Sequence, residues 1–216
     1  MSSITEKAKN QKQVLTLNEL SKRKVVEHNS LITSIAKMDK TPLKMFELAV
    51  SCINTEEPPK DNTVYLSKRD LFAFFKVSDN DKHRRFKEAV EKMQKQAFFQ
   101  IKEEEGKGFK FKSIVPIPYV EWTDYHDEVK IEFHREIMPY LINLKKNFTQ
   151  HALSEISELN SKYSIILYRW LSMNYNQYEH YSAKGGRRTE QVESYRNPSI
   201  SVKELRIMTD TVNEYQ

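Results

Sequence analysis

The stretch SKRDLFAFFKVSDNDKHRRFKEAVEKM, residues 67 to 93, predicts two helices joined by a short turn. Ser67 followed by Asp70 has capping-box spacing, which starts a helix with a bulky apolar face that ends near Lys76. The polar segment KVSDND separates this helix from a second one, which runs to about Ala97. Two helices joined by a tight turn are typical of a helix-turn-helix.

The second of these helices divides its residues between a buried and an exposed face. Its apolar residues recur at helical spacing and are Phe86, Val90, Met93 and Ala97. At about 100° per residue, Arg84 and Lys95 then point away from the core. The KHRR cluster places cations at the helix N-terminus, where the helix dipole favours anions. We therefore expect an anionic partner, such as a phosphate, at this end.

The same charges also permit a helix face that is only solvated. Four oppositely charged pairs stand four residues apart, and such pairs weakly stabilise a helix in water. They are Arg84 with Glu88, Lys87 with Glu91, Glu88 with Lys92, and Glu91 with Lys95. Both interpretations stay open at the level of sequence.

Extended segments follow the second helix. FFQIKEEE and FKFKSIVPI flank a GKG turn, and EVKIEFH supplies a third alternating strand. This order predicts a winged helix of the α+β class, with the first two segments as the wing. Lys107, Lys110 and Lys112 then surround the wing tip, while Phe109 and Phe111 fall on the alternate face.

Segments before the helix-turn-helix complete the expected domain. VVEHNSLITSIA, residues 25–36, predicts extended pieces because β-branched residues flank a turn-prone HNS. Thr41 as N-cap and Pro42 at the first helical position predict a helix, and TVYL predicts a strand. REIMPYLINLKKN predicts a short helix near Pro139, and the apolar spacing after it predicts a long core helix through Trp170.

The C-terminal part of the sequence predicts a linker followed by the start of a second helix-turn-helix. Residues 179–199 are polar and glycine-bearing, which indicates a surface loop or linker. Ser201, Glu204 and Leu205 then repeat the pattern that opens the first helix-turn-helix, so we expect a second one that needs a continuation to pack against. The expected divisions are a flexible tail (1–17), a first winged-helix domain (18–178), a linker (179–199) and a truncated second domain (200–216).

Composition excludes several classes of function. The formal charge of +5 suits a polyanionic partner. Four glycines outside any phosphate-loop spacing argue against a nucleotide cofactor, and six scattered histidines with one cysteine argue against a metal site. No carboxylate pair or nucleophile stands in a catalytic pattern, so we expect no enzyme and no catalytic residue. Without a signal peptide or membrane span in the sequence, we expect a cytoplasmic protein.

Three segments together resemble a known family. LNSKYSIILYRWL (159–171), LSKRDLFAFFKV (66–77) and ISVKELRIMT (200–209) are similar to replication initiator proteins of the RepB type, from theta-replicating bacterial plasmids. The likeness runs from about Asn18 to the end of the chain, and the Ser-Lys-Tyr start of the long helix is its strongest element.

The resemblance implies two winged-helix domains that bind directly repeated sites, called iterons, in double-stranded origin DNA. It also implies a homodimer that represses its own gene, with a host replication initiator and a helicase as further partners. In such a protein the first domain supplies dimer contacts and grips the DNA backbone. The residues that we expect to contact DNA are Lys82, Arg84, Arg85, Lys87, Lys107, Lys110 and Lys112.

Two other classes of protein stay open. A winged-helix transcriptional repressor without a role in initiation would bind a single inverted repeat rather than direct repeats. A nicking enzyme of rolling-circle plasmids would need a metal-binding histidine pair and a tyrosine nucleophile. Tyrosines are abundant in the sequence, whereas the histidine pair is missing.

Overall fold

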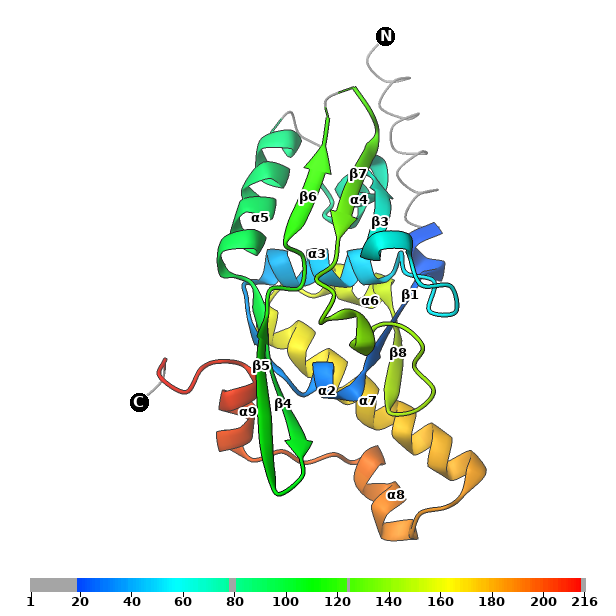
Figure 1. The fold of residues 1–216 in the computed structure, drawn as a ribbon. Helices are drawn as coiled ribbons and strands as arrows, with labels where there is room; N and C mark the ends of the chain where they lie inside the picture. The colour runs from blue at the N-terminus through cyan, green and yellow to red at the C-terminus, as the bar shows by residue number, and fades with distance from the viewer. Residues whose placement is uncertain (1–18, 78–80, 124, 215–216) are drawn as a thin grey trace.

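The computed structural model describes residues 19–77, 81–123 and 125–214. The expected tail, residues 1–17, lies outside the described residues. Figure 1 shows the helix-turn-helix and its small sheet at one end of the molecule, and a long helix with a second sheet at the other.

The predicted helix-turn-helix is present. It consists of α4 (Lys68–Phe74) and α5 (Lys82–Gln96), packed with α3 (Lys40–Val50). The backbone N–H of Asp70 donates to Ser67 Oγ at 3.0 Å, which confirms Ser67 as the cap of α4. The α3 helix begins with Asp39 as its N-cap, two residues before the predicted Thr41.

A three-stranded antiparallel sheet lies beside these helices. It contains β3 (Thr63–Ser67), β6 (Tyr119–Trp122) and β7 (Glu128–Glu132) in the order β3-β7-β6. Val64 and Val120 both lie opposite Ile131, and all three side chains are buried. The hairpin formed by β6 and β7 is therefore the wing of this winged helix, and it rises beside α5 (Figure 1).

The sequence-based prediction of which hairpin forms the wing was wrong. Its strands, β4 (Phe98–Glu105) and β5 (Gly108–Ile114), form a separate sheet with β2 (Ile35–Lys37), in the order β2-β4-β5. The physical reason is the pairing of apolar residues, because Phe99 lies opposite Ala36 on one side and Ile114 on the other. This hairpin is an insertion between α5 and the wing, and its far end points away from them (Figure 1).

The remaining elements build the other end of the molecule. They are β1 (Lys24–His28) paired with β8 (Phe148–Ala152), the helices α2 (Asn29–Ile32), α6 (Leu153–Glu158), α7 (Lys162–Lys184), α8 (Thr189–Arg196) and α9 (Val202–Met208), and 3-10 turns at Lys60–Asn62 and Met138–Tyr140. The predicted long helix is confirmed as α7, which Ser161 caps by accepting from the Ser164 N–H at 3.0 Å.

Residues 179–199 are mostly helical, which corrects the loop expected there. The α7 helix continues to Lys184, and α8 follows after Gly185 and Gly186, both with positive φ. Stacking of Tyr181 on Tyr195, with ring centroids 5.8 Å apart, holds α8 against α7. Ser201 caps α9 as predicted, and α9 packs against β2. The second winged helix and the domain boundaries stay predictions.

A shared apolar core joins the two ends. The rings of Phe46 in α3 and Phe99 in β4 lie 4.9 Å apart, and Phe133 approaches Phe46 at 6.4 Å. All three side chains are buried, so the helix-turn-helix and the inserted hairpin share one core. Among the described helices, none has the length and apolar character to cross a membrane.

Candidate nucleic-acid interface

The α5 helix presents the candidate surface as its sequence predicts. Phe86, Val90, Met93 and Ala97 are at most 5% exposed, whereas Arg84 lies on the opposite, exposed face. The first turn of α5 contains only cations and an imidazole, with no acidic residue. A helix N-terminus with this composition favours an anion from outside the helix.

Intrahelical ion pairs neutralise part of this surface. The Arg84 guanidinium lies 2.8 Å from Glu88 and 3.2 Å from Asp81, and these contacts raise the pKa of Arg84. Lys95 lies 3.9 Å from Glu91. The other two predicted pairs, Lys87 with Glu91 and Glu88 with Lys92, are not among the ion pairs of the described residues. The solvated-face interpretation is therefore correct in part, and Lys87 keeps a charge that these pairs leave available.

The three hairpin lysines lie in different surroundings. Lys107 is in the two-residue turn with Gly106, whose φ of 59° suits glycine. Lys110 faces Glu103 across the strands. Lys112 Nζ lies 3.0 Å from Glu103 and 3.1 Å from the Tyr140 hydroxyl, and these hydrogen bonds raise the pKa of Lys112. Only Lys107 therefore stands at the tip, while Lys112 is part of an internal polar contact.

The two groups of cations lie at opposite ends of the molecule. From Arg84 to Gln96, α5 spans about 18 Å, and the eight residues of β4 continue for about 26 Å. Both elements run in the same direction in Figure 1. The structure thus brings Lys82, Arg84, Arg85 and Lys87 together on α5 and places the hairpin lysines far from them.

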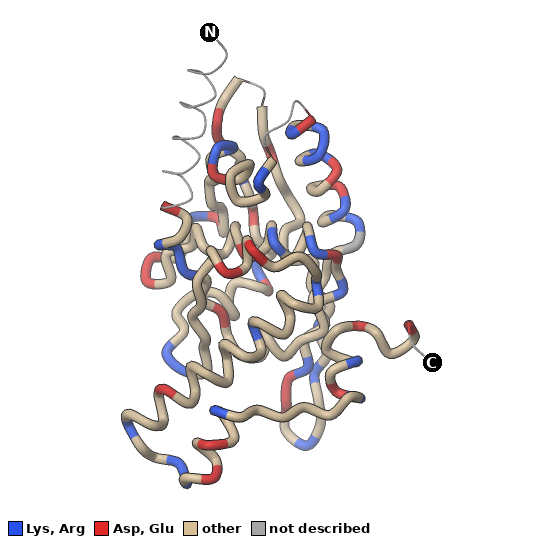
Figure 2. The backbone as a smooth tube through the Cα atoms, turned by 180° about the vertical axis from the view of Figure 1, so that it is seen from behind, with Lys and Arg blue, Asp and Glu red and all other residues tan. Residues whose placement is uncertain are grey.

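Charges of both signs mix along each element. Figure 2 shows blue and red alternating along α5, and red as well as blue on the inserted hairpin. Glu103, Glu104 and Glu105 of β4 offset most of the hairpin's lysines. The hairpin is therefore less basic than its lysines alone suggest.

Sequence reasoning missed the residues of the true wing. Tyr125 is 95% exposed at its tip, next to His126. Lys130 on β7 lies 5.2 Å from the ring of Tyr119 and 3.8 Å from Glu121. The signal that could have found this wing was the alternation of YVEW, which places Val120 on the same buried face as the predicted third strand.

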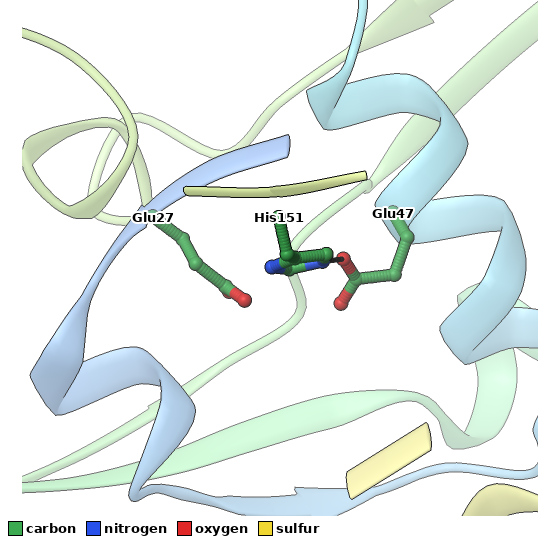
Figure 3. Close-up of side chains that lie close together, drawn as sticks. All are labelled: Glu27, Glu47 and His151. Atoms are coloured by element: carbon green, nitrogen blue, oxygen red, sulfur yellow. Dashed lines mark hydrogen bonds and ion pairs between the residues drawn. The ribbon is translucent and has the colours of Figure 1, made fainter. Parts of the chain in front are cut away.

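A buried polar cluster is the group of described residues best placed to hold a metal. Ligand atoms of Glu27, Glu47 and His151 lie within 4.8 Å of one another, from β1, α3 and β8 (Figure 3). The Arg169 guanidinium of α7 already fills this position. Its Nε lies 2.8 Å from Glu27 and 3.0 Å from Glu47, and its Nη2 also donates to Glu27. The cluster thus has its own cation and fits a structural role better than a metal site.

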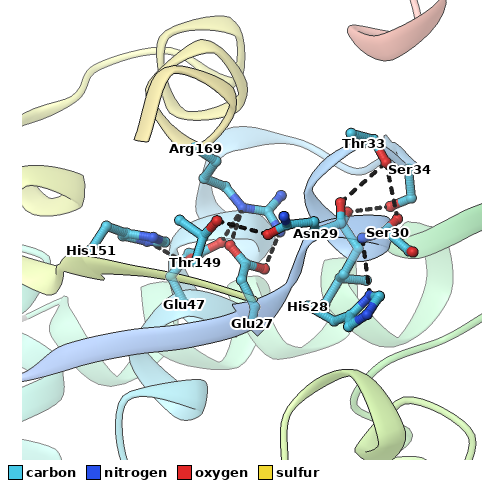
Figure 4. A network of polar contacts seen from close by, with 11 residues as sticks. Glu27, His28, Asn29, Ser30, Thr33, Ser34, Glu47, Thr149, His151 and Arg169 are labelled. Carbon is cyan, nitrogen blue, oxygen red and sulfur yellow. Dashed lines mark hydrogen bonds and ion pairs between the residues drawn. The ribbon is translucent and has the colours of Figure 1, made fainter. Parts of the chain in front are cut away.

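Burial and charge set the protonation of this cluster. Burial raises the pKa of Glu27, although Arg169 opposes this shift. Burial also disfavours the charged form of Glu47, but Arg169 and His151 outweigh it and lower the pKa of that carboxyl. Figure 4 shows that the polar contacts continue to Thr149, whose hydroxyl donates to Asn29 at 2.8 Å.

The helix-turn-helix, its sheet and the β6–β7 wing define the class of this protein as a winged-helix domain. Residues 24–172 match the model of the family described as initiator replication protein, WH1. The chain belongs to this family.

Individual relatives agree with this assignment. A replication initiation protein of Escherichia coli is 29% identical over 99 residues, which cover 44% of this chain and 27% of that protein. The crystal structure of the Pi initiator protein in complex with iteron DNA has a TM-score of 0.55 and 19% identity, over 72% of this chain and 65% of that one. The chain thus spans about a quarter of the curated relative's length, and the likeness to the Pi initiator supports the fold.

Proposed function

We propose that this protein is a plasmid replication initiator that binds directly repeated sites in double-stranded origin DNA. Its membership of the initiator family over residues 24–172 carries the proposal. The name of the curated relative, a replication initiation protein, and the iteron DNA bound by the Pi initiator support it. The protein acts in the cytoplasm by binding, not by catalysis, and works with a host initiator and a helicase.

The α5 helix is the part of the fold that approaches the duplex. Its N-terminal turn carries Lys82, Arg84 and Arg85, and Lys87 follows on the exposed side. Contacts of such side chains to phosphates position a protein on the duplex, and contacts to base edges in the grooves then read the sequence. The side-chain contacts of Arg84 with Asp81 and Glu88 lie on the solvent face, so a phosphate can exchange with either carboxylate.

Footprinting on the plasmid's own origin tests this proposal. We expect protection of the direct repeats at protein concentrations that leave a duplex of the same composition in shuffled order unprotected. Equal protection of both duplexes would contradict the recognition of repeats. Protection of a single inverted repeat instead would favour the repressor without a role in initiation.

We further propose that the protein forms a homodimer that represses its own gene. The order β2-β4-β5 leaves one edge of β5 unpaired within the described residues, and such edges pair with other chains. Phe109 and Phe111 on this strand are 55% and 74% exposed. An open edge with two exposed rings supports pairing of β5 with its copy in a second protomer.

A further inference from the structure

A cavity of about 560 Å³ opens between α3, α4, α5 and the end of α6. Its lining includes Lys82, Arg85, Ala89 and Lys92 of α5, whose spacing puts them on the side turned toward α3. Lys87 and Lys95 lie outside this lining. The cavity therefore shares Lys82 and Arg85 with the residues of α5 that we assign to DNA, whereas Arg84 and Lys87 do not line it.

The floor of the cavity is apolar. Met45, Leu71 and Phe74 are buried beneath it, and Phe72 and Phe75 are half-buried at its side. Concave sites of a few hundred Å³ with aromatic walls are where proteins bury the apolar part of a ligand.

Cations dominate the rim. They are Lys40, Lys44, Lys76, Lys82, Arg85 and Lys92, against the two acids Glu88 and Glu158. Both acids are engaged, since Glu158 lies 2.8 Å from Lys76 and Glu88 lies 2.8 Å from Arg84. Within the described part of the chain, no ion pair involves Lys40, Lys82 or Lys92. The rim therefore attracts anionic groups.

Lys44 adds a buried cation to this rim. Its side chain donates to the Ser157 carbonyl at 2.7 Å and is mostly buried. Burial, with Lys40 and Lys76 nearby, lowers the pKa of Lys44 to about 8. An anionic group seated beside it would restore its full charge.

The spacing of the cations limits the class of ligand. Lys82 and Lys92 are ten residues apart on one helix, which separates them by about 15 Å. A ligand with a single charged head cannot reach both. A DNA duplex presents phosphates over this distance, but it has no apolar group to fill the floor. An acidic peptide with a bulky apolar side chain matches both features.

We propose that this cavity docks an acidic peptide segment of a partner protein. One aromatic or aliphatic side chain of the segment packs against Phe72 and Phe75, and flanking carboxylates pair with Lys40, Lys82 and Lys92. The adjoining cavity next to Lys40 and Lys92 also contains Lys162, so the cationic surface continues toward α7. This inference does not depend on the proposed role in replication.

Selection from a displayed library of random peptides on the whole chain tests the proposal. We expect enriched peptides that combine several Asp or Glu residues with a Phe, Trp or Leu anchor. Synthetic copies should bind at least 10-fold more weakly to the double variant Lys40→Glu/Lys92→Glu in fluorescence anisotropy. The matched control Lys60→Glu/Lys203→Glu makes the same charge change on exposed residues away from the cavity and should alter affinity less than twofold.

A variant that fills the cavity distinguishes peptide binding from DNA binding. Ala89→Phe occupies the cavity without changing charge, and circular dichroism with a thermal melt checks that it folds. It should lose peptide binding and keep its affinity for duplex and single-stranded DNA. Three results would overturn the proposal: no enriched peptides, enriched peptides without acids, or DNA affinity that falls in Ala89→Phe as much as peptide affinity does.

Discussion

At the scale of single residues, the notable feature is an arginine that is almost completely buried in the core. Arg169 is 1% exposed and holds Glu27 and Glu47, which lie on segments far apart in the sequence. Breaking one side of a buried ion pair leaves an uncompensated charge in the core. The cluster thereby ties α7 to β1 and α3.

Replacing Arg169 with methionine tests this role. Because two carboxylates lose their cation, we expect Arg169→Met to lower the free energy of unfolding by about 3 to 5 kcal/mol. Urea denaturation measures the loss. Arg135→Met is a suitable control, because the Arg135 side chain is 83% exposed, and should change stability by less than about 0.5 kcal/mol. Equal losses in the two variants would contradict the structural role of the cluster.

The two carboxylates should respond differently to pH. The lowered pKa of Glu47 contributes stability above its ordinary value of 4.5, and this contribution disappears as the pH falls through the folded-state value. Glu47→Gln should therefore cost most near neutral pH, and its deficit should shrink in acid.

Glu27→Gln supplies the matched comparison. The raised pKa of Glu27 contributes stability below 4.5 that is lost as the pH rises through the folded-state value. The amide introduced by this substitution imitates the neutral acid, so the variant should gain stability relative to the wild type as the pH rises. Denaturation curves between about pH 3.5 and 7.5 measure both trends, and parallel curves for the two variants would contradict the assignment.

Sequence patterns gave a partial view of these residues. Glu27 falls on the same face of KVVEH as the buried Val25, and Arg169 interrupts an apolar helix, so the sequence carries a local signal for each buried charge, although we predicted neither. Their partnership was beyond the sequence, because 142 residues separate them along the chain. Local spacing carries no information about which distant segments meet.

At the scale of elements, the helix-turn-helix could be predicted and the wing could not. A cap at Ser67 and helical spacing on α5 are local signals, and the structure confirms both. Two hairpins follow α5, and the sequence predicted the first of them as the wing, although the second one forms it. Only the pairing of β3 with β7, which joins residues more than sixty positions apart, decides between them.

The exposed rings of the inserted hairpin lead to a prediction about the proposed homodimer. If β5 pairs with its copy, the double variant Phe109→Ser/Phe111→Ser should raise the dimer dissociation constant at least 10-fold, because two exposed rings lose their apolar contact. Sedimentation velocity over a concentration series measures this change. Tyr125→Ser, at the even more exposed tip of the true wing, should leave association unaltered. A wild-type chain that stays monomeric at high concentration would rule out the dimer.

At the scale of the whole molecule, cations gather at two ends and not along one continuous stripe. The formal charge of +5 is small, and acids accompany the lysines at both ends (Figure 2). In the proposed function, affinity for DNA then depends on which end the duplex touches. Composition predicted an anionic partner but could not place it, because the lysines that appear clustered in the sequence are divided between α5 and the inserted hairpin.

The salt dependence of DNA binding distinguishes the α5 end of the molecule from the end with the inserted hairpin. Arg85→Ala/Lys87→Ala on α5 should weaken binding to specific and random duplex alike and reduce the slope of log K against log salt by about 2, one unit per lost phosphate contact. Lys107→Ala/Lys110→Ala on the hairpin should leave the slope within about 0.5 of the wild-type value if the duplex lies on α5 alone. Anisotropy titrations from low to moderate salt measure both. The reverse order of effects would move the DNA to the hairpin end.

The inserted hairpin also makes the molecule modular. Because Phe99 lies opposite Ile114, the polypeptide leaves the domain and returns to it at neighbouring points. Ile101 is buried, and Glu103 and Lys112 contact Tyr140. Only the turn at Gly106 and Lys107 can therefore be lengthened or exchanged while the entry and exit points stay fixed. A fluorescent protein spliced between Gly106 and Lys107 would therefore report on assembly from one end, while the helix-turn-helix at the other end remains as it is.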